Sequence, residues 1–377
     1  MNPAPHPAQT TRPSLFDPLM VGELHLQNRV VMAPLTRNRA PGTVPTAMMA
    51  TYYAQRADPA TGAGLIISEA SQISPQGQGY QDTPGIFSSD QVAAWRVVTD
   101  AVHQRGGLIA CQLWHVGRIS HERLQPGGGQ PVSSSARTAA SRVMVDGEFI
   151  ACSPPRALRD DELPGIVADY AHAARCAMDA GFDAVEVHAA NGYLLEQFLR
   201  DSLNDREGAW GGGLDGRTRL LTEVLQAVAH EAGSGRTGLR LSPVSPVNGL
   251  GQDSQPQALY EHVLARLAPL NLAFAHLVEG TTGGARDEVP FDHAALRRHF
   301  AGAWVVNNGY TREMALQAVE DGRADAVAFG RPFIANPDLG WRLRHQQPWA
   351  DADRQTFYRG GERGYTDYPA VAPTTSA

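Results

Sequence analysis

Short, continuous apolar runs recur along the chain, and stretches with a different apolar spacing separate them. Eight such runs are found, at residues 29–35, 64–69, 108–114, 184–188, 238–242, 274–278, 304–308 and 326–330. Runs of Val, Ile, Leu and Ala of this length are typical of parallel strands that are buried on both faces. The pattern therefore predicts eight central strands.

The intervening stretches place apolar residues three and four positions apart, which indicates helices. Residues 90–105 carry one stripe, formed by Val92, Trp95, Val98, Thr99 and Val102. Residues 163–180, 218–231 and 312–321 repeat the pattern, and a glycine often follows, as a helix end requires. Eight β-α units in 377 residues predict the α/β fold class and, within it, a (β/α)₈ TIM barrel.

Two segments interrupt this rhythm. Alternating polarity around Gly22-Glu23 predicts an N-terminal hairpin that plugs one end of the barrel. Residues 116–162, after the third strand, are too long for an ordinary connection and contain a second predicted hairpin at 143–150. An insertion after a barrel strand lies on the catalytic face, so we expect it to cap the site. We predict one barrel domain over 15–370, a disordered tail at 1–14 and a tail at 371–377.

Composition limits the classes of partner. The formal net charge is −7 and no basic run is found, so a nucleic-acid surface is not expected. The 42% hydrophobic and 19% charged residues suit a soluble globular protein, and no apolar run could span a membrane. We expect a cytoplasmic monomer or homodimer that acts on a small molecule.

The cysteines and the N-terminus bear on the compartment. Cys111, Cys152 and Cys176 lack CxxC spacing, so neither a zinc site nor an iron–sulfur cluster is indicated. Their odd number suits a reducing cytosol. Residues 1–14 lack the apolar core of a signal peptide, which agrees with a cytoplasmic location.

The fourth predicted strand runs directly into polar residues that could do chemistry. Its end reads His188-Ala189-Ala190-Asn191-Gly192-Tyr193, just before a predicted helical turn. In barrel folds, ligands bind at the carboxyl ends of the strands. An imidazole and an amide can hold an oxyanion, and a phenol can deliver a proton. The alternative is a buried His and Asn satisfied by the backbone, with Tyr193 in the core.

The last two predicted strands end in small residues and an arginine. Asn308-Gly309 follows the seventh strand and Gly330-Arg331 the eighth. Such residues commonly cradle a phosphate through backbone N–H groups and a guanidinium. Turn glycines with a surface arginine are the alternative, but the two positions together favour a phosphate site. The strand ends carry few carboxylates, so a magnesium or zinc ion is not indicated.

Six motifs spread over residues 15–370 are more specific in combination. They are RVVMAPLTRNRA at 29–40, SEASQISPQGQGY at 68–80, CQLWHVGR at 111–118, VHAANGYLLEQFL at 187–199, FGRPFIANPDL at 329–339 and GYTDYP at 364–369. With these motifs the chain resembles the Old Yellow Enzyme family of FMN-dependent ene-reductases, and within it the bacterial branch of maleimide, nitrate-ester and xenobiotic reductases. The resemblance implies FMN as the cofactor and NAD(P)H as the electron donor, with NADPH favoured.

The resemblance also implies a set of cofactor-binding residues. Thr36 would hydrogen-bond the flavin carbonyl next to the nitrogen that carries the hydride. Gln112 would bond the pyrimidine edge, and Arg240 would face the opposite polar edge, where negative charge gathers on reduction. The remaining members would pack on the ring or hold the phosphate: Ala33, Pro34, Leu35, Ala70, Asn308, Gly309, Gly330 and Arg331.

The family's chemistry carries over to three residues of the fourth strand end. In a ping-pong cycle, hydride would pass from the reduced flavin to the β-carbon of an α,β-unsaturated carbonyl or nitro compound. His188 and Asn191 would bind the substrate's carbonyl or nitro oxygens, and Tyr193 would protonate the α-carbon. The substrate pocket would be lined by Tyr80, Trp114 and Tyr358.

Three positions depart from patterns found within the family. Some relatives have a second His where Asn191 stands, another branch has a Cys where Thr36 stands, and residues 207–213 differ from the usual acidic-tyrosine-glycine run. Two other functions stay open. One is a non-redox, phosphate-binding isomerase or aldolase, which would need a lysine nucleophile or carboxylate base at a strand end. The other is a catalytically silent flavin-binding protein, which would not need the intact His188, Asn191 and Tyr193.

Overall fold

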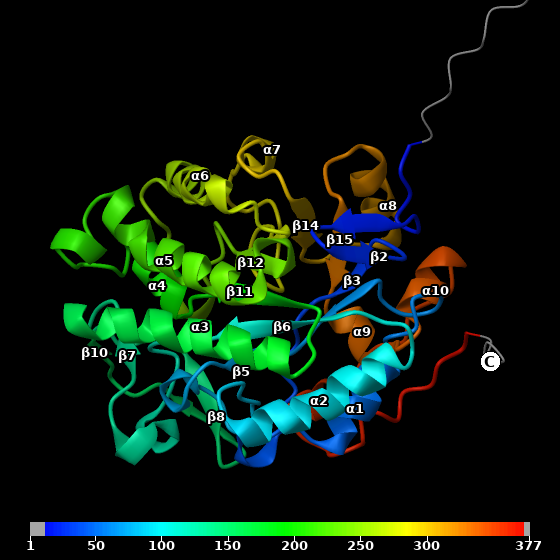
Figure 1. Ribbon diagram of the computed structural model, residues 1–377, viewed down its shortest axis with the longest axis horizontal. Coiled ribbons are helices and arrows are strands. Elements are labelled where there is room, and N and C mark those ends of the chain that lie inside the picture. The colour runs from blue at the N-terminus through cyan, green and yellow to red at the C-terminus, as the bar shows by residue number, and fades with distance from the viewer. Residues whose placement is uncertain (1–11, 373–377) are drawn as a thin grey trace, which may run out of the picture.

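Eight parallel strands close into a barrel at the centre of the molecule (Figure 1). The computed structural model describes residues 12–372, so most of the predicted N-terminal tail and residues 373–377 lie outside the described residues. The barrel strands are β3 (Val30–Met32), β4 (Leu65–Ile67), β6 (Ile109–Trp114), β11 (Ala184–Ala189), β12 (Thr237–Leu241), β13 (Phe274–Val278), β14 (Ala303–Asn307) and β15 (Ala326–Phe329). Pairing of β15 with β3 and of β6 with β11 closes the ring. The predicted (β/α)₈ barrel and its eight strands are confirmed.

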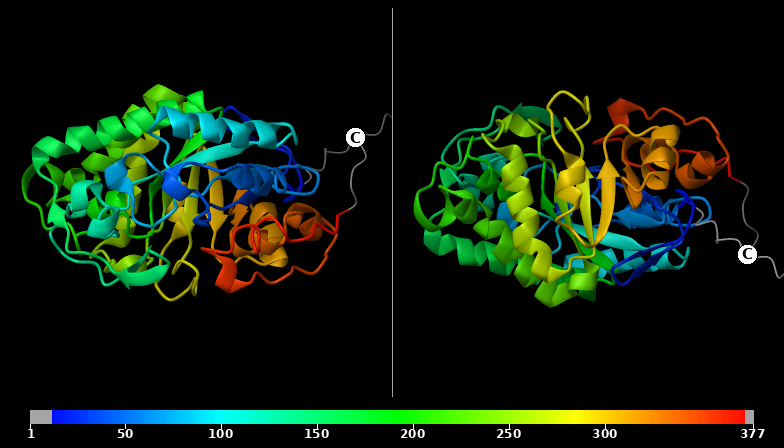
Figure 2. Two further views of the ribbon diagram at one scale, coloured as in Figure 1. Left: turned by 90° about the horizontal axis from the view of Figure 1, so that it is seen from below. Right: turned by 90° about the horizontal axis from the view of Figure 1, so that it is seen from above.

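Helices surround the barrel, as the two views of Figure 2 show. The four predicted helices correspond to α2 (Ser89–His103), α3 (Leu163–Asp179), α5 (Leu214–Ala232) and α8 (Arg312–Glu320). The others are α1 (Ala47–Ala54), α4 (Leu194–Leu199), α6 (Pro256–Leu267), α7 (His293–Arg297), α9 (Arg331–Ala335) and α10 (Leu339–Arg344). Ser88 and Gln91 form a capping box that fixes the start of α2. The helix α5 begins four residues before the predicted start, directly after Gly213, which is its N-cap.

The bottom of the barrel is apolar. The predicted plug is confirmed as an antiparallel hairpin of β1 (Leu19–Val21) and β2 (Leu24–Leu26), which turns at Gly22 with φ +57°. Hairpin residues Val21, Leu24 and Leu26 share one buried cluster with residues that the barrel strands point inward, among them Ala110, Ala184, Phe274 and Val305. This cluster excludes water from the lower half of the barrel.

Above this apolar floor, the inward-facing positions become polar. Side chains two residues apart on a strand point to the same face. The inward residues that follow the apolar ones are therefore Gln112, Glu186, His276 and Asn307, and Arg240 is the register partner of His276. The carboxyl ends of the strands thus begin with a buried polar layer, which is where a barrel binds its ligands.

The insertion after the third strand contains two small sheets. The predicted hairpin is present as β8 (Arg142–Val145) and β9 (Glu148–Ala151), joined by Asp146 and Gly147, both with positive φ as a type I′ turn requires. The second sheet pairs β7 (Val132–Ser133) with β10 (Arg156–Ala157) in parallel. A further short strand, β5 (Ser71–Gln72), pairs with the end of β6.

The C-terminal segment returns to the first barrel strand. It passes beside α1 as the red trace of Figure 1. Two buried arginines that follow β3 hold it: Arg37 Nη2 donates to the Gly364 carbonyl at 2.7 Å, and Arg39 Nη2 donates to the Thr356 carbonyl at 2.8 Å. These bonds place Tyr358 at the mouth of the barrel.

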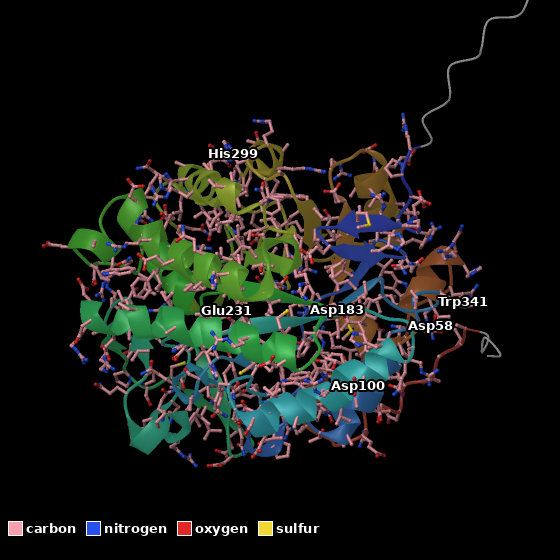
Figure 3. All side chains as sticks on the ribbon, viewed as in Figure 1. Asp58, Asp100, Asp183, Glu231, His299 and Trp341 are labelled. Carbon is pink, nitrogen blue, oxygen red and sulfur yellow. The ribbon has the colours of Figure 1, made fainter. Side chains whose placement is uncertain are left out.

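Polar side chains cover the outer helices, as Figure 3 shows with Glu231 and Asp100 among those labelled. At the contact between α3 and α5, Arg175 Nη2 lies 2.8 Å from Glu231 Oε1. Within residues 12–372 there is no helix that is both long and apolar enough to cross a membrane. The three cysteines are free and buried. The cytoplasmic location and the oligomeric state stay predictions.

Candidate active site

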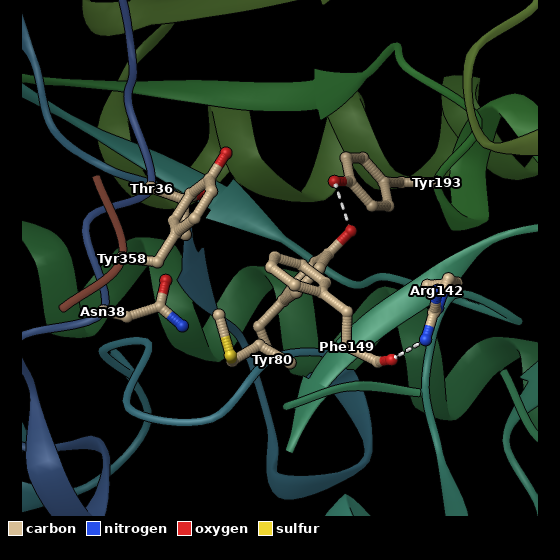
Figure 4. A pocket seen from close by; sticks show the side chains of 8 residues that line it. Thr36, Asn38, Tyr80, Arg142, Phe149, Tyr193 and Tyr358 are labelled. Carbon is tan, nitrogen blue, oxygen red and sulfur yellow. Dashed lines mark hydrogen bonds between the residues drawn. The ribbon is translucent and has the colours of Figure 1, made fainter. Parts of the chain in front are cut away.

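Two cavities lie at the carboxyl ends of the barrel strands. The smaller one, of about 190 Å³, is shown in Figure 4 and is lined by Thr36, Asn38, Tyr80, Arg142, Met144, Phe149, Tyr193 and Tyr358. The larger one, of about 590 Å³, has walls from six strand ends, including Leu35, Asn191, Arg240, Thr282, Asn308, Gly309, Gly330 and Arg331. Tyr358 lines both cavities, so the two are neighbours at this residue.

Three rings pack together beside the smaller cavity, and one of them, Tyr193, lines it. Tyr193 meets Trp114 edge-on, with ring centroids 4.9 Å apart, and meets His188 in the same way at 5.1 Å. His188 and Trp114 are both at most 3% exposed. Three of the predicted site residues, from two strands and the loop after β11, are therefore brought into contact.

Asn191 occupies an unusual backbone conformation and is held by two neighbours. Its φ is +59°, a left-handed value that asparagine tolerates better than most residues. The Ser242 hydroxyl accepts from its backbone N–H at 2.8 Å, and the Thr282 hydroxyl donates to its Oδ1 at 2.7 Å. Because Thr282 occupies the amide oxygen, the NH₂ group of Asn191 is left to donate to a ligand.

The Tyr193 hydroxyl lies 3.4 Å from the Tyr80 hydroxyl, as the dashed line in Figure 4 shows. Burial raises the pKa of Tyr193, while hydrogen bonds from Tyr80 and Asn248 act against that rise. Burial also raises the pKa of Tyr80 well above its ordinary value. Both phenols therefore hold their protons at neutral pH, and the side chains of Tyr80 and Asn248 lie within hydrogen-bonding reach of the Tyr193 hydroxyl.

His188 is neutral in this environment. Burial lowers its pKa well below the ordinary range, and the positive charge of Arg240 lowers it further. Its Nδ1 has no hydrogen-bond partner among residues 12–372. A neutral imidazole carries one N–H, so His188 can donate one hydrogen bond to a substrate oxygen without adding a charge.

The larger cavity suits a flat, anionic cofactor such as FMN. At the inner end of the cavity lies Arg240, which is only 6% exposed. Its Nε has no hydrogen-bond partner within the described residues. At the other end, Gly309 has a φ of +66° with open space where a side chain would lie, and Arg331 lines the wall. A buried guanidinium with an unpartnered Nε, together with an accessible glycine backbone and an arginine, is what a flavin's polar edge and phosphate would need.

The side chain of Asn308 is held by the protein itself. Its side chain donates to the Glu279 and Thr281 carbonyls at 2.6 and 2.9 Å and accepts from the Gly283 N–H at 3.0 Å. The amide is thereby fully engaged in holding the loop after β13. Only the backbone of Asn308 remains for a phosphate.

The other predicted cofactor residues are divided among the two cavities and the buried residues around them. Ala33 and Pro34 line the larger cavity together with Leu35. Ala70 packs in the cluster that contains Trp114, and Gln112 lies beneath the cavities with its amide bonded to Glu186. Thr36 lines the smaller cavity, next to Tyr358 in Figure 4.

The structure adds residues that the sequence did not indicate. Phe149 and Met144 of the insertion wall the smaller cavity, and Thr282 and Asn248 hold Asn191. The Phe149 and Tyr358 rings meet edge-on at 6.1 Å. The only sequence signal for Phe149 and Met144 was the Asp146-Gly147 turn, because it indicated a hairpin on the catalytic face. Groups of three or more metal-ligating side chains are absent from the described part of the chain.

Comparison with known proteins was made for the whole chain. A profile of the NADH:flavin oxidoreductase / NADH oxidase family matches residues 14–349. The chain is 43% identical over 359 residues to a putative 12-oxophytodienoate reductase 11 of Oryza sativa subsp. japonica, covering 94% of this chain and 97% of the relative. It is 41% identical over 364 residues to 12-oxophytodienoate reductase 2 of Arabidopsis thaliana, covering 96% of each.

Solved structures give the same picture. The fold is similar to morphinone reductase in complex with tetrahydroNAD, with a TM-score of 0.91 and 46% identity over 97% of this chain and 99% of that one. It is also similar to the old yellow enzyme homologue from Zymomonas mobilis, with a TM-score of 0.90 and 44% identity over 95% of this chain and 99% of that one.

Proposed function

Because the chain belongs to the NADH:flavin oxidoreductase / NADH oxidase family, as an FMN-dependent, NAD(P)H-using member of the Old Yellow Enzyme type, we propose that it reduces activated alkenes. The substrates would be α,β-unsaturated carbonyl and nitro compounds. One observation carries the proposal: Tyr193 lines the smaller cavity and packs against His188, and Asn191 lines the larger cavity, so two neutral donors and one protonated phenol lie at the carboxyl end of β11. This set matches what an enone needs on its oxygen and its α-carbon.

In the proposed arrangement, FMN occupies the larger cavity. Arg331 and the backbone of Gly309 and Gly330 hold its phosphate, and Arg240 and Gln112 hold the ring edge. Thr36 and the segment Ala33–Leu35 lie against the ring. When bound, FMN supplies hydride chemistry, taking hydride from NAD(P)H and giving it to the alkene's β-carbon.

His188 and Asn191 bind the substrate oxygen. One N–H of the neutral imidazole and the free NH₂ of Asn191 donate to that oxygen, which gains negative charge as the β-carbon is reduced. Each such donor contributes about 3–4 kcal/mol to the transition state in comparable sites. The bonds from Ser242 and Thr282 hold Asn191 in place before substrate arrives, so little reorganisation is required.

Tyr193 supplies the proton. Its O–H bond breaks, the proton forms a bond to the α-carbon, and the enolate's electron pair becomes that bond. Donors from Tyr80 and Asn248 then stabilise the phenolate until it takes a proton from solvent. The alkene thereby gains one hydride and one proton, and NAD(P)H loses one hydride.

The alternative of a Schiff-base aldolase has no chemical support in this chain. Such an enzyme needs a lysine amine to attack the carbonyl carbon. All 32 basic residues counted as Lys or Arg are arginines, so the sequence contains no lysine. The half-buried, oriented Asn191 and Tyr193 also exceed what a silent flavin carrier would require.

Isotope labelling tests the proposal. The holoenzyme is incubated without oxygen with 2-cyclohexenone and either deuterated NAD(P)H in water or unlabelled NAD(P)H in D₂O. We expect cyclohexanone with deuterium at the β-carbon in the first case and at the α-carbon in the second. An allylic alcohol as product, or NAD(P)H oxidation only when oxygen is admitted, would show that the enzyme does not reduce the C=C bond.

A further inference from the structure

A buried carboxylate lies beneath the larger cavity, in the polar layer above the barrel floor. Glu186, on β11 two residues before His188, is 0% exposed. Gln112 Nε2 donates to its Oε1 at 2.6 Å, and His276 Nδ1 lies 2.7 Å from its Oε2. The proposed chemistry uses neither Glu186 nor His276, although a buried charge is retained only where it is well paired.

The strand register brings these groups together. Gln112 is the register partner of Glu186 on the neighbouring strand β6. On the other side, the partner of Glu186 on β12 is Gly238, which has no side chain. The Phe274 ring fills the space beside Gly238, and His276, two residues further along β13, lies within hydrogen-bonding distance of the Glu186 carboxylate.

The hydrogen bonds fix the orientation of both partners. An ionised carboxylate only accepts hydrogen bonds, so Gln112 must present its N–H to Glu186 and turn its amide oxygen away from it. His276 must donate from Nδ1. Burial, the largest influence, lowers the pKa of His276, so its ring is neutral and its Nε2 carries a lone pair.

Glu186 also opposes the charge of Arg240. The carboxylate acts to raise the pKa of Arg240, against the larger effect of burial, which lowers it. A negative charge beneath the flavin's polar edge should disfavour the reduced, more negative flavin, while Arg240 favours it. The carboxylate and the guanidinium therefore act in opposite directions on the same equilibrium.

We propose that Glu186 is a positioning residue of the FMN site, which orients the amide of Gln112, partly neutralises Arg240 and so keeps the flavin's reduction potential low. His276 completes the site by binding the second oxygen of the carboxylate. The inference rests on the proposed placement of FMN over Gln112 and Arg240, and it does not depend on which substrate the enzyme reduces.

The variant Glu186→Gln isolates the charge. Its amide oxygen can accept from Gln112, and its NH₂ can donate to His276 Nδ1 if the imidazole moves its proton to Nε2, which has no partner within residues 12–372. We expect the reduction potential of bound FMN, measured against a reference dye, to become more positive by at least about 30 mV. For a two-electron couple, this shift is a tenfold change in the equilibrium constant. An unchanged potential would overturn the charge effect.

The variant Glu186→Asp tests the positioning effect, because it keeps the charge but is too short to reach both partners. We expect FMN to bind at least tenfold more weakly, by fluorescence titration of the apoprotein, with a potential close to that of the wild type. If Glu186→Gln does not fold, this result decides alone: wild-type affinity in Glu186→Asp overturns the proposal.

Two further variants separate local effects from general ones. Asp338 is another buried carboxylate, paired with Arg342 on α10, and does not line the two cavities. Asp338→Asn should leave the potential of bound FMN unchanged, and a shift equal to that of Glu186→Gln would overturn the proposal.

Gln112→Leu should weaken FMN binding. If the Gln112→Leu protein binds FMN normally, the proposed placement of FMN is wrong. If it binds FMN weakly but both Glu186 variants behave like the wild type, the placement stands and only the role of Glu186 is refuted.

Discussion

The hydroxyl oxygens of Tyr80 and Tyr193 lie 3.4 Å apart, although 113 positions separate the two residues in the chain. Tyr80 follows the segment after β4, and Tyr193 follows β11, so two loops on one face of the barrel supply the pair. In the proposed chemistry Tyr193 is the proton donor, and the Tyr80 hydroxyl is close enough to share a hydrogen bond with it.

Tyr193→Phe should separate proton delivery from flavin reduction. The ring stays, so its packing against Trp114 and His188 should hold. Reduction of the flavin by NADPH should keep its rate, and reoxidation by 2-cyclohexenone should slow by 10²-fold or more, about the lower range for general acids. Nitroalkenes should suffer less, because a nitronate is stable enough to be protonated in water. Stopped-flow records of both half-reactions decide it, and a slower flavin reduction with normal enone reoxidation would contradict the assignment.

Removing both proposed oxygen-binding donors should abolish the binding of phenolate-type ligands. In the double variant of His188→Ala and Asn191→Ala, a phenol titrated into the oxidised holoenzyme should lose its long-wavelength charge-transfer band. The single variants should each weaken binding by a smaller factor, since one donor remains. Undiminished binding in the double variant would place the anion elsewhere.

Arg331→Ala should weaken FMN retention without unfolding the barrel. The side chain lines the larger cavity next to Gly330, where we place the phosphate. Dialysis followed by flavin absorbance should show loss of cofactor, while the far-ultraviolet circular dichroism stays unchanged. Arg354→Ala, which removes an exposed arginine outside both cavities, is the matched control. A fully loaded Arg331→Ala protein after prolonged dialysis would count against this phosphate site.

Phe149→Ala should change which enones are accepted. The ring is 43% exposed and meets Tyr358 edge-on, so it narrows the mouth of the smaller cavity. We expect kcat/KM to rise for bulky enones relative to 2-cyclohexenone, with FMN binding unchanged. Met20→Ala removes a similarly exposed apolar side chain, 59% exposed, from the plug hairpin and should change nothing. Loss of FMN with an unchanged substrate range would show that the insertion supports the cofactor instead.

Glu69 should make stability depend on pH. Burial raises its pKa from 4.5 to about 7, although the Arg37 N–H and nearby guanidiniums act to lower it. Between pH 4.5 and about 7, the Glu69 carboxyl is therefore protonated in the folded state and ionised in the unfolded state. That stabilisation is fully present below pH 4.5 and is lost as the pH rises through 7. The difference is at most about 3 kcal/mol.

Glu69→Gln carries a permanently neutral group of the same shape, so it should remove this dependence. Thermal unfolding from pH 5 to 8 should show the wild type losing stability relative to the variant. Parallel curves for the two proteins would show that Glu69 does not titrate in this range.

The barrel was predictable because its strands are buried on both faces and therefore appear as uninterrupted apolar runs. The polar stretch from His188 to Tyr193 and the glycines at 309 and 330 stood out because they interrupt those runs at their carboxyl ends. Glu186 did not stand out, since one acidic residue inside Ala184–Ala189 does not disturb the pattern. Its pairing with Gln112 and His276 depends on the register of three strands, and no local spacing encodes that register.

The side-chain contacts of Asn308 could not be predicted for a related reason. Its place at a strand end was correct, but its amide reaches the loop after β13, and that contact depends on where the loop folds back. The contact between Phe149 and Tyr358 likewise joins the insertion to the C-terminal segment. Sequence spacing locates strand ends well, and it does not tell which distant side chains meet above them.

The arginines that hold the C-terminal segment have a consequence for biosynthesis. The guanidinium of Arg37 binds a carbonyl that lies 327 positions later in the chain. While the ribosome makes the intervening residues, Arg37 and Arg39 must stay hydrated, because burying an unpaired cation is costly. The mouth of the pocket therefore forms late, and a nascent chain stalled before residue 356 would hold a nearly complete barrel without Tyr358 at its entrance.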